Sequence, residues 1–239
     1  MSREFRFNRV LLKISGEALK GTQDHGYDAE AVREVVSRVK RIIDQDVEVA
    51  LVVGAGNIWR GVMGRSGGMD RVNAEYMGML ATVMNALCLR DFFTAAGVPA
   101  IVQSSIGMEP IAPRYDRVKA IRALEAGQLV IFAGGTGSPF FTTDTTAVLR
   151  ALETDCDAVL KATKVDGVYT ADPMKDPSAR RFATLSFDEA LSRQLKVMDS
   201  TAFSMCRDND LPIIVFNFSD PESFEAVLAG DTAYGTIVS

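Results

Sequence analysis

The chain has 239 residues, of which 47% are hydrophobic, so it is long enough to bury a sizeable core. Its formal net charge is -5, and no run of Lys or Arg exceeds two residues, which argues against a nucleic acid partner. The three cysteines, Cys88, Cys156 and Cys206, are far apart and outside any CxxC pattern, which argues against a disulfide framework or a zinc site.

The amino-terminal ten residues are charged and lack the apolar segment of a secretory signal. Nowhere is an apolar run long enough to cross a bilayer. The cysteines have the character of small apolar side chains in a reducing compartment. We therefore expect a cytoplasmic protein that has no membrane partner.

The first predicted strand, residues 10–14, contains Lys13 and runs into Ser15, Gly16 and Glu17. A lysine in such a strand either extends from the strand end to water or is a cation fixed at the carboxyl edge of a sheet, where α/β folds bind ligands. The glycine that follows at once favours the second interpretation.

A polar loop at 21–26 carries the only histidine, His25. Because no cysteine or second histidine accompanies it, we assign His25 no chemical role. From Asp28, a plausible N-cap, apolar residues recur at helical spacing as far as Ile43. This pattern predicts a helix that covers one face of a sheet.

The next predicted strand, 47–53, leads into Gly54-Ala55-Gly56-Asn57-Ile58-Trp59-Arg60-Gly61. Trp59 replaces the third glycine of a dinucleotide fingerprint, so this motif alone is weak evidence. The glycines still offer backbone to a phosphate, and Arg60 offers a permanently charged fork. We expect Trp59 to pack in the protein, and we expect residues 63–68, which are rich in glycine, to form a mobile loop.

A long helix is predicted over residues 70–96, ended by Gly97 and Pro99. Its methionines indicate a core or a subunit contact rather than a metal site. Further helices are predicted at 115–126, 145–154, 186–195, 200–208 and 221–229, and further strands at 99–103, 129–133, 158–162, 213–216 and 236–238.

A glycine-rich stretch at 134–144 lies between a predicted strand and a predicted helix. Such a turn lets backbone N–H groups approach an anion, although an ordinary βα loop would need the same glycines. Its two phenylalanines, four hydroxyl residues and one carboxylate exceed what a turn requires. We therefore hypothesise a phosphate site in this stretch.

Strands alternate with helices along the chain, which predicts an α/β fold. We expect a three-layer sandwich whose mostly parallel central sheet is covered by helices on both faces. Because no linker, repeat or low-complexity segment interrupts the pattern, residues 1–239 are expected to form a single domain.

In a parallel sheet, the turns after Lys13, at Gly54, at Gly134 and at Thr163 should open on one edge. Cations, backbone N–H groups and carboxylates gathered there suit phosphoryl transfer. The chain has no G-x-x-x-x-G-K-[ST] motif, which excludes a P-loop kinase. It also has no G-x-S-x-G motif or Ser-His-Asp set, which is consistent with a reaction that needs no nucleophilic side chain.

The most specific motifs lie at residues 12–19, 54–61, 77–85, 137–144, 161–169, 196–199 and 212–217. Together they resemble those of the bacterial UMP kinases, of the amino acid kinase superfamily, over nearly the whole chain. The resemblance implies transfer of the γ-phosphoryl group of ATP to UMP, giving UDP in pyrimidine nucleotide synthesis. It implies catalytic roles for Lys13, Arg60, Asp144 and Asp199, and Mg²⁺ held mainly by nucleotide phosphates.

By the same resemblance, the carboxy-terminal part of the chain mainly binds ATP and the amino-terminal part mainly binds the acceptor UMP. The implied ATP-binding residues are Lys13, Ile14, Ser15, Gly16, Gly56, Arg60, Thr163, Tyr169 and Asp172. The implied UMP-binding residues are Ala55, Glu75, Thr136, Gly137, Ser138, Pro139, Phe140, Phe141, Thr142 and Thr143. The phenylalanines are expected to be walls of the acceptor pocket.

Members of that family are homohexamers that GTP activates and UTP inhibits. The resemblance implies the same assembly and the same regulation for this chain. The loop implied in the GTP effect is Gly21, Thr22, Gln23, Asp24, His25 and Gly26. Two residues depart from the family pattern. Ala55 replaces the middle one of three glycines, and Glu75 replaces an aspartate near the UMP ribose.

Two alternatives stay open at this point. Another kinase of the superfamily would act on a carboxylate or a carbamate, whereas the two phenylalanines and nearby hydroxyls favour a nucleotide acceptor. A catalytically silent nucleotide sensor would pass a signal to a partner. The joint presence of Lys13, Arg60, Asp144 and Asp199 speaks against the sensor.

Overall fold

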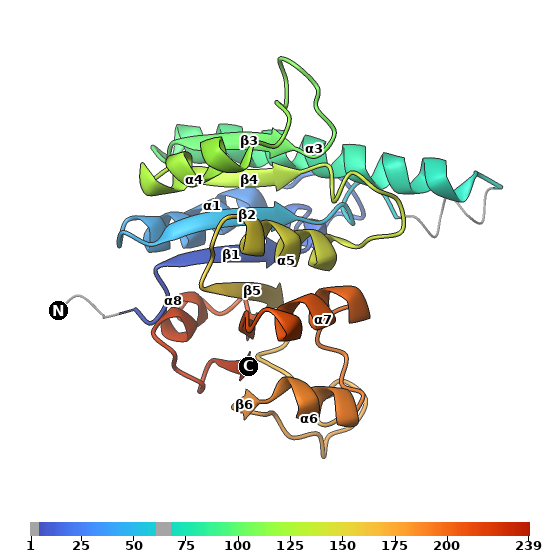
Figure 1. Cartoon of the computed structure of the whole chain (residues 1–239), viewed down its shortest axis with the longest axis vertical. Coiled ribbons are helices and arrows are strands. Elements are labelled where there is room, and N and C mark those ends of the chain that lie inside the picture. Colours follow the sequence, from blue (N-terminus) through green and yellow to red (C-terminus); the bar gives the residue numbers. More distant parts are fainter. Residues whose placement is uncertain (1–4, 61–67) are drawn as a thin grey trace.

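The computed structural model describes residues 5–60 and 68–239. Within them, eight strands form one sheet in the order β3-β4-β2-β1-β5-β7-β8-β6 (Figure 1). The strands are β1 Arg9–Ile14, β2 Glu48–Val53, β3 Ala100–Ser104, β4 Leu129–Ala133, β5 Ala158–Thr163, β6 Thr184–Leu185, β7 Ile213–Asn217 and β8 Gly235–Val238. Neighbouring strands are parallel except β7 and β8, which are antiparallel. The expected mostly parallel sheet is therefore confirmed.

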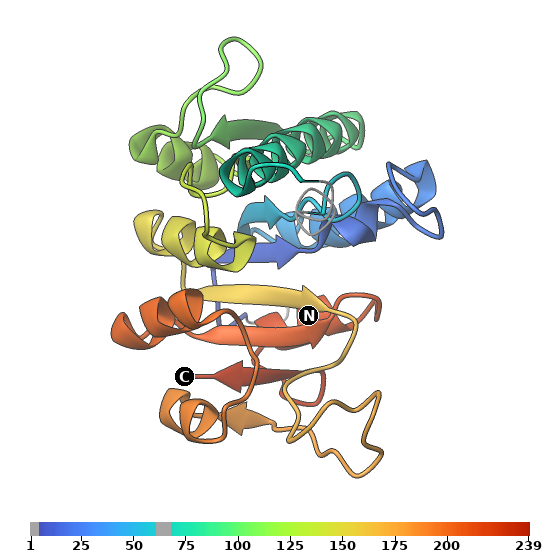
Figure 2. The same cartoon turned by 90° about the vertical axis from the view of Figure 1, so that its right-hand side faces the viewer.

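Helices cover both faces of the sheet, as predicted (Figure 2). They are the 3₁₀ helix η1 Gly16–Leu19, followed by α1 Ala29–Ile43, α3 Arg71–Ala95, α4 Arg117–Glu125, α5 Thr143–Glu153, α6 Phe187–Ser192, α7 Ser200–Asp208 and α8 Ser223–Leu228. One core cluster lies between the sheet and α1, α3 and α8, and the other lies between the sheet and α4 to α7.

Residues of β1 show how one strand supplies both cores. Leu12 and Ile14 belong to the first cluster, whereas Leu11 belongs to the second, and all three side chains are fully buried. Successive side chains of a strand point to opposite faces, so a strand covered on both sides is a continuous apolar run. Lys13 interrupts that run at the carboxyl end of the strand.

Capping residues begin the long helices at the predicted positions. The Asp28 carboxylate accepts the backbone N–H of Ala31 at 2.8 Å and begins α1. Asp70 accepts the backbone N–H of Asn73 at 3.0 Å and begins α3. These bonds satisfy N–H groups that have no partner within the helix.

Other bounds differ from the sequence prediction at the carboxy-terminal end. Helix α6 ends at Ser192 instead of 195, because Gln194 adopts a left-handed conformation with φ 53°. The short strand β6 and the helix η1 were not predicted, since neither is long enough to show a period.

The expected loop at 63–68 lies, except for Gly68, outside the described residues. Across the part of the chain that the structure describes, no helix is both long enough and apolar enough to cross a membrane. Cys156 and Cys206 are buried thiols, and burial raises the pKa of each to about 12. They pack as small apolar residues, as expected.

Candidate active site

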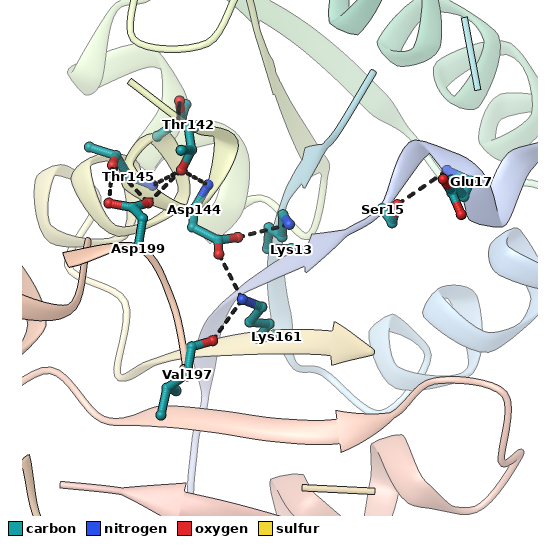
Figure 3. A network of polar contacts seen from close by, with 10 residues as sticks. Lys13, Ser15, Glu17, Thr142, Asp144, Thr145, Lys161, Val197 and Asp199 are labelled. Atoms are coloured by element: carbon teal, nitrogen blue, oxygen red, sulfur yellow. Dashed lines mark hydrogen bonds and ion pairs between the residues drawn. The ribbon is translucent and has the colours of Figure 1, made fainter. Parts of the chain in front are cut away.

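Three charged side chains from β1, β5 and α5 form the centre of the site (Figure 3). Lys13 and Lys161 are opposite each other in the register of two neighbouring parallel strands, so their side chains leave the same face of the sheet. Asp144, in the first turn of α5, contacts both. Its Oδ1 lies 2.8 Å from Lys13 Nζ, and its Oδ2 lies 2.7 Å from Lys161 Nζ.

Lys161 is not among the predicted site residues, although its sequence contains a usable signal. Like Lys13, it is a lysine near the end of an apolar strand. Its ammonium group also donates to the carbonyl of Val197 at 2.7 Å, so it is fixed by two acceptors. Lys13 has Asp144 as its single ion-pair partner among the described residues, which leaves N–H donors available for a ligand.

The charge balance of this cluster is positive. Burial by itself would raise the pKa of Asp144, but the charges of Lys13 and Lys161 and their hydrogen bonds outweigh burial and hold that pKa below its usual value. The carboxylate is therefore ionised at neutral pH. Two ammonium groups and one carboxylate leave a surplus positive charge, which suits an anionic ligand and a phosphoryl group in transfer.

Asp199 does not touch the lysines; it connects α7 to α5 (Figure 3). Its carboxylate caps α7 through two backbone N–H groups, both at 3.0 Å. It also accepts the hydroxyls of Thr142 and Thr145. Thr142 is the N-cap of α5, so Asp199 holds the helix start that carries Asp144.

The turns after β1 and β2 pack directly on each other. A Cβ at Gly16 would lie 2.3 Å from the Gly54 carbonyl oxygen and 2.5 Å from Asn57 Oδ1, so glycine is required there. Asn57 and Asn85 are buried and exchange hydrogen bonds at 3.0 and 2.8 Å. Asn85 Nδ2 also donates to the Gly54 carbonyl at 2.7 Å. This buried amide pair, which was not predicted, fixes the geometry of both turns.

Arg60 lies beside the first of these turns. Its Nη2 is 2.6 Å from Glu17 Oε1, and Lys164 Nζ is 3.7 Å from the other Glu17 oxygen. The Arg60 side chain is 55% exposed and forms no described contact with Lys13 or Asp144. The residues that follow it, 61–67, are outside the described part of the chain.

A cavity of about 200 Å³ lies between α3 and the start of α5. Of the predicted acceptor residues it contains Ala55, Glu75, Phe141, Thr142 and Thr143. Its remaining lining was not among the predicted acceptor residues, although Gly135 belongs to the predicted phosphate-binding stretch: Trp59, Ala74, Gly78, Met79, Thr82 and Gly135. Trp59, which was expected only to pack, also lines this cavity. Its indole N–H donates to the Ala74 carbonyl at 2.9 Å.

The other predicted acceptor residues are outside that lining. They are Thr136, Gly137, Ser138, Pro139 and Phe140. Phe140 is 57% exposed, has a left-handed backbone with φ 75°, and lies under the guanidinium of Arg71 at 4.6 Å. In this conformation, Phe141 is the phenylalanine that forms a wall.

A second cavity, of about 580 Å³, opens beside β5. It includes the predicted ATP residues Thr163, Tyr169 and Asp172, as well as Lys161 from the central cluster. The Tyr169 hydroxyl donates to Asp166 at 2.6 Å, and this bond raises the pKa of Tyr169. The rest of its lining, which includes residues 193–197, was not predicted. Ile14, Ser15, Gly16 and Gly56 lie at the neighbouring turns, outside this lining.

The predicted regulatory loop at 21–26 is exposed apart from Gly26, and His25 is exposed within it. Gly26 is tied to the site, because its N–H donates to the Asn57 carbonyl at 2.7 Å and its carbonyl accepts from Asn57 Nδ2 at 3.1 Å. Within residues 5–60 and 68–239, no group of three or more His, Cys, Asp or Glu side chains could hold a metal.

The sequence of the chain places it in a known family. Residues 8–217 match the amino acid kinase family. The chain belongs to that family.

Particular relatives are more specific. The chain is 52% identical to a curated protein named uridylate kinase from Ectopseudomonas mendocina (strain ymp), over 99% of this chain and 95% of that protein. Among solved structures, UMP kinase from Bacillus anthracis superposes with a TM-score of 0.94 at 36% identity, over 98% of this chain and 96% of that one. UMP kinase from Ureaplasma parvum superposes with a TM-score of 0.92 at 36% identity, over 98% and 99%.

Proposed function

We propose that this chain transfers the γ-phosphoryl group of ATP to UMP, giving UDP for pyrimidine nucleotide synthesis. The observation that carries the proposal is the cluster of Lys13, Asp144 and Lys161 beside two cavities. Lys161 lines the larger cavity, and Asp144 directly follows Thr142 and Thr143, which line the smaller one. Relatives named uridylate kinase and UMP kinase support the choice of acceptor.

In the reaction, an oxygen of the UMP phosphate bonds to the γ-phosphorus of ATP as the bond to the bridging oxygen of ADP breaks. The protein needs no covalent intermediate, because charge stabilisation and positioning are enough. Lys13 offsets charge on the transferred group, and Asp144 orients Lys13 and Lys161 toward it. Asp199 holds the first turn of α5 in place. Arg60, which is exposed and paired with Glu17, is the second cation for the nucleotide phosphates.

We assign the larger cavity to ATP and the smaller one to UMP. Thr163, Tyr169 and Asp172 then surround the adenosine, while the turn from Lys13 through Gly16, together with Gly56 and Arg60, approaches the phosphates. The acceptor residues are Ala55, Glu75 and the segment 136–143, of which Phe141, Thr142 and Thr143 already line the smaller cavity. The amino-terminal part thus mainly holds UMP, the carboxy-terminal part mainly holds ATP, and residues 1–239 act as one domain.

The carboxylates at the centre have protein partners. Both oxygens of Asp144 contact lysines, and the Asp199 carboxylate accepts hydroxyl and backbone donors. Because these carboxylates are occupied by protein donors, the site fits a Mg²⁺ ion that is carried by the phosphates of ATP rather than by the protein. When bound, the ion neutralises phosphate charge in the transition state.

We further infer a homohexamer in the cytoplasm, activated by GTP and inhibited by UTP. An exposed apolar face on α3 supports self-association; Tyr76, Met77, Leu80 and Met84 on it are 38–53% exposed. The loop at 21–26 suits a regulatory role, because Gly26 is hydrogen-bonded to Asn57, beside the Gly16 turn. Light scattering with and without each nucleotide, and rate measurements with each effector, test these assignments.

A panel of acceptors tests the proposed function. Purified protein with ATP and Mg²⁺ is given UMP, CMP, AMP, GMP, a carboxylate or carbamate separately, and ADP release is measured. We expect UMP to be the best acceptor, with UDP as the product. Turnover with a carboxylate or carbamate alone would establish a different kinase of the family. Tight nucleotide binding without turnover on any acceptor would indicate a sensor.

A further inference from the structure

Arg150 is a buried cation on α5 that lines neither cavity at the site. Its side chain is 7% exposed. One end of the guanidinium forms an ion pair with Glu153, and its plane lies over the Tyr115 ring at 3.7 Å from the centroid. The other end, Nη2, donates to the Ser105 hydroxyl at 2.8 Å. Arg150 is therefore held in one orientation with a donor aimed at Ser105.

Ser105 passes this interaction to the wall of the smaller cavity. Its hydroxyl accepts from Arg150 and donates to the Gly135 carbonyl at 2.6 Å. Gly135 is one of the residues that line that cavity. A hydroxyl that accepts from a cation is polarised and becomes a stronger donor, so the two hydrogen bonds reinforce each other.

The segment around Gly135 needs such a restraint. Gly134, Gly135 and Gly137 have φ of 75°, 58° and 82°, a region in which glycine has many accessible alternatives. Two side chains from other elements hold the segment: Thr82 accepts the Gly134 N–H at 2.9 Å, and Ser105 holds the Gly135 carbonyl. Without Ser105, the peptide after Gly135 could rotate.

Rotation of that peptide would redirect the N–H group of Thr136, which belongs to the proposed acceptor segment. The carbonyl and N–H of a trans peptide point in opposite directions, so a Gly135 carbonyl turned toward Ser105 aims the Thr136 N–H away from Ser105. Among the described residues, the N–H groups of Gly135 and Thr136 donate no hydrogen bond. They are available to an anionic or carbonyl-bearing acceptor.

A purely structural role does not require an arginine here. Burying a guanidinium costs solvation free energy, and an apolar side chain of similar volume often stabilises a protein as well or better. Methionine could fill the space over Tyr115 and beside the sheet. It could not donate to Ser105, and that donation is what the position supplies.

We propose that Arg150 is a positioning residue for the acceptor nucleotide, acting through Ser105 to hold the Gly135 peptide in its binding orientation. This inference rests on the proposed function, in that the smaller cavity holds the acceptor. Arg150 itself does not touch substrate. Its loss should weaken acceptor binding and leave ATP binding intact, because neither Arg150 nor Ser105 lines the larger cavity.

Two variants test the relay, Ser105→Ala and Arg150→Met, each with a matched control elsewhere. Arg38→Met removes another largely buried arginine, on α1, which pairs with Glu34 and lies over the Phe218 ring. Ser223→Ala removes a buried hydroxyl in the first turn of α8, whose proton is shared between the carbonyls of Asn217 and Asp220. KM values for UMP and ATP are measured, and UMP Kd is measured from the fluorescence of Trp59, the single tryptophan, which lines the smaller cavity.

We expect both relay variants to raise KM and Kd for UMP about tenfold and to leave KM for ATP within about twofold of wild type. The double variant should match the single ones, because both remove the same relay. Arg150→Lys, which keeps a donor without the fork, should fall between wild type and Arg150→Met. Both controls should leave each constant unchanged.

Two results would overturn the relay. One is a UMP affinity in Ser105→Ala and Arg150→Met that equals wild type. The other is a parallel loss of UMP and ATP affinity, which would mean general loosening. Either result with an active wild type rejects the relay alone, whereas a wild type that phosphorylates no acceptor rejects the proposed function itself. Ser105→Ala removes one oxygen atom, so the test stands even if Arg150→Met folds poorly.

Discussion

Replacing Asp144 with asparagine removes the negative charge that lies between Lys13 and Lys161 and keeps the shape of the side chain. Two ammonium groups, both within 2.8 Å of this carboxylate, would then face each other with no counter-charge. The variant therefore perturbs both the stability of the protein and the orientation of its central cations, and the two effects can be measured separately.

The loss of stability can be estimated from burial. Removing one partner of a buried ion pair costs about 3–5 kcal/mol. Lys13, Asp144 and Lys161 keep 15%, 12% and 19% side-chain exposure, so water screens part of the repulsion, and we expect a loss of about 2–3 kcal/mol. For a chain of this length that lowers Tm by about 4–12 °C in calorimetry.

The effect on rate should be larger than instability explains. Misplaced cations no longer match the charge of the transition state, so kcat for phosphorylation of UMP should fall by about 10²–10³ at a temperature where the variant is folded. A coupled assay for ADP measures it. KM for both nucleotides should change less than kcat, because the cluster acts mainly on the transferred group.

Glu48→Gln is the matched control. Glu48 pairs with Arg9 at 2.5 Å, at the opposite end of β1 and β2 from the site. This variant should lose stability without losing kcat. If Asp144→Asn kept kcat within about threefold of wild type, the assigned role of the carboxylate in orienting the two lysines would be refuted.

Three further results follow from the structure. Phe141→Ala should raise KM for UMP about tenfold and Phe140→Ala much less, because of these two phenylalanines only Phe141 lines the smaller cavity. Equal effects of the two variants on KM in steady-state assays would contradict this. Asn85→Ala leaves two buried acceptors without a donor and should lower the free energy of unfolding in urea by about 2–4 kcal/mol, whereas a loss below about 1 kcal/mol would contradict a structural role for the amide pair. The pKa of Asp144 is depressed in the folded state, so its stabilisation is full above the ordinary carboxylate pKa of about 3.9 and is lost as pH falls through the lower folded value. The stability difference between wild type and Asp144→Asn should accordingly be constant from about pH 5 to 8 and shrink only in strong acid.

Much of the fold could be predicted from local sequence. The bounds of β4 and α7 match the prediction, and Asp28 and Asp70 begin their helices as expected. These features depend on neighbouring residues: side-chain period, capping carboxylates and glycine turns act within a few positions of the chain. The antiparallel β8 was not anticipated, because strand direction depends on the partner strand.

The site was predicted in part for the same reason. Lys13 and Asp144 each stand out within a short motif, and both are at the centre. Lys161 becomes their partner only because β1 and β5 are adjacent in the sheet. Asp199 proved to hold the start of α5 rather than to contact the lysines, which depends on how α7 packs on α5.

The sequence by itself determined the alternating strands and helices, the glycine turns at one sheet edge, and the cations and carboxylates that phosphoryl transfer needs. The tertiary structure decided which of these groups meet. It joined Asp144 to two lysines, Asn85 to the Gly54 turn, and Arg150 through Ser105 to Gly135. The physical reason is that periodicity and capping are short-range, whereas the partner of a buried polar group is set by strand order and helix packing, which bring distant segments together.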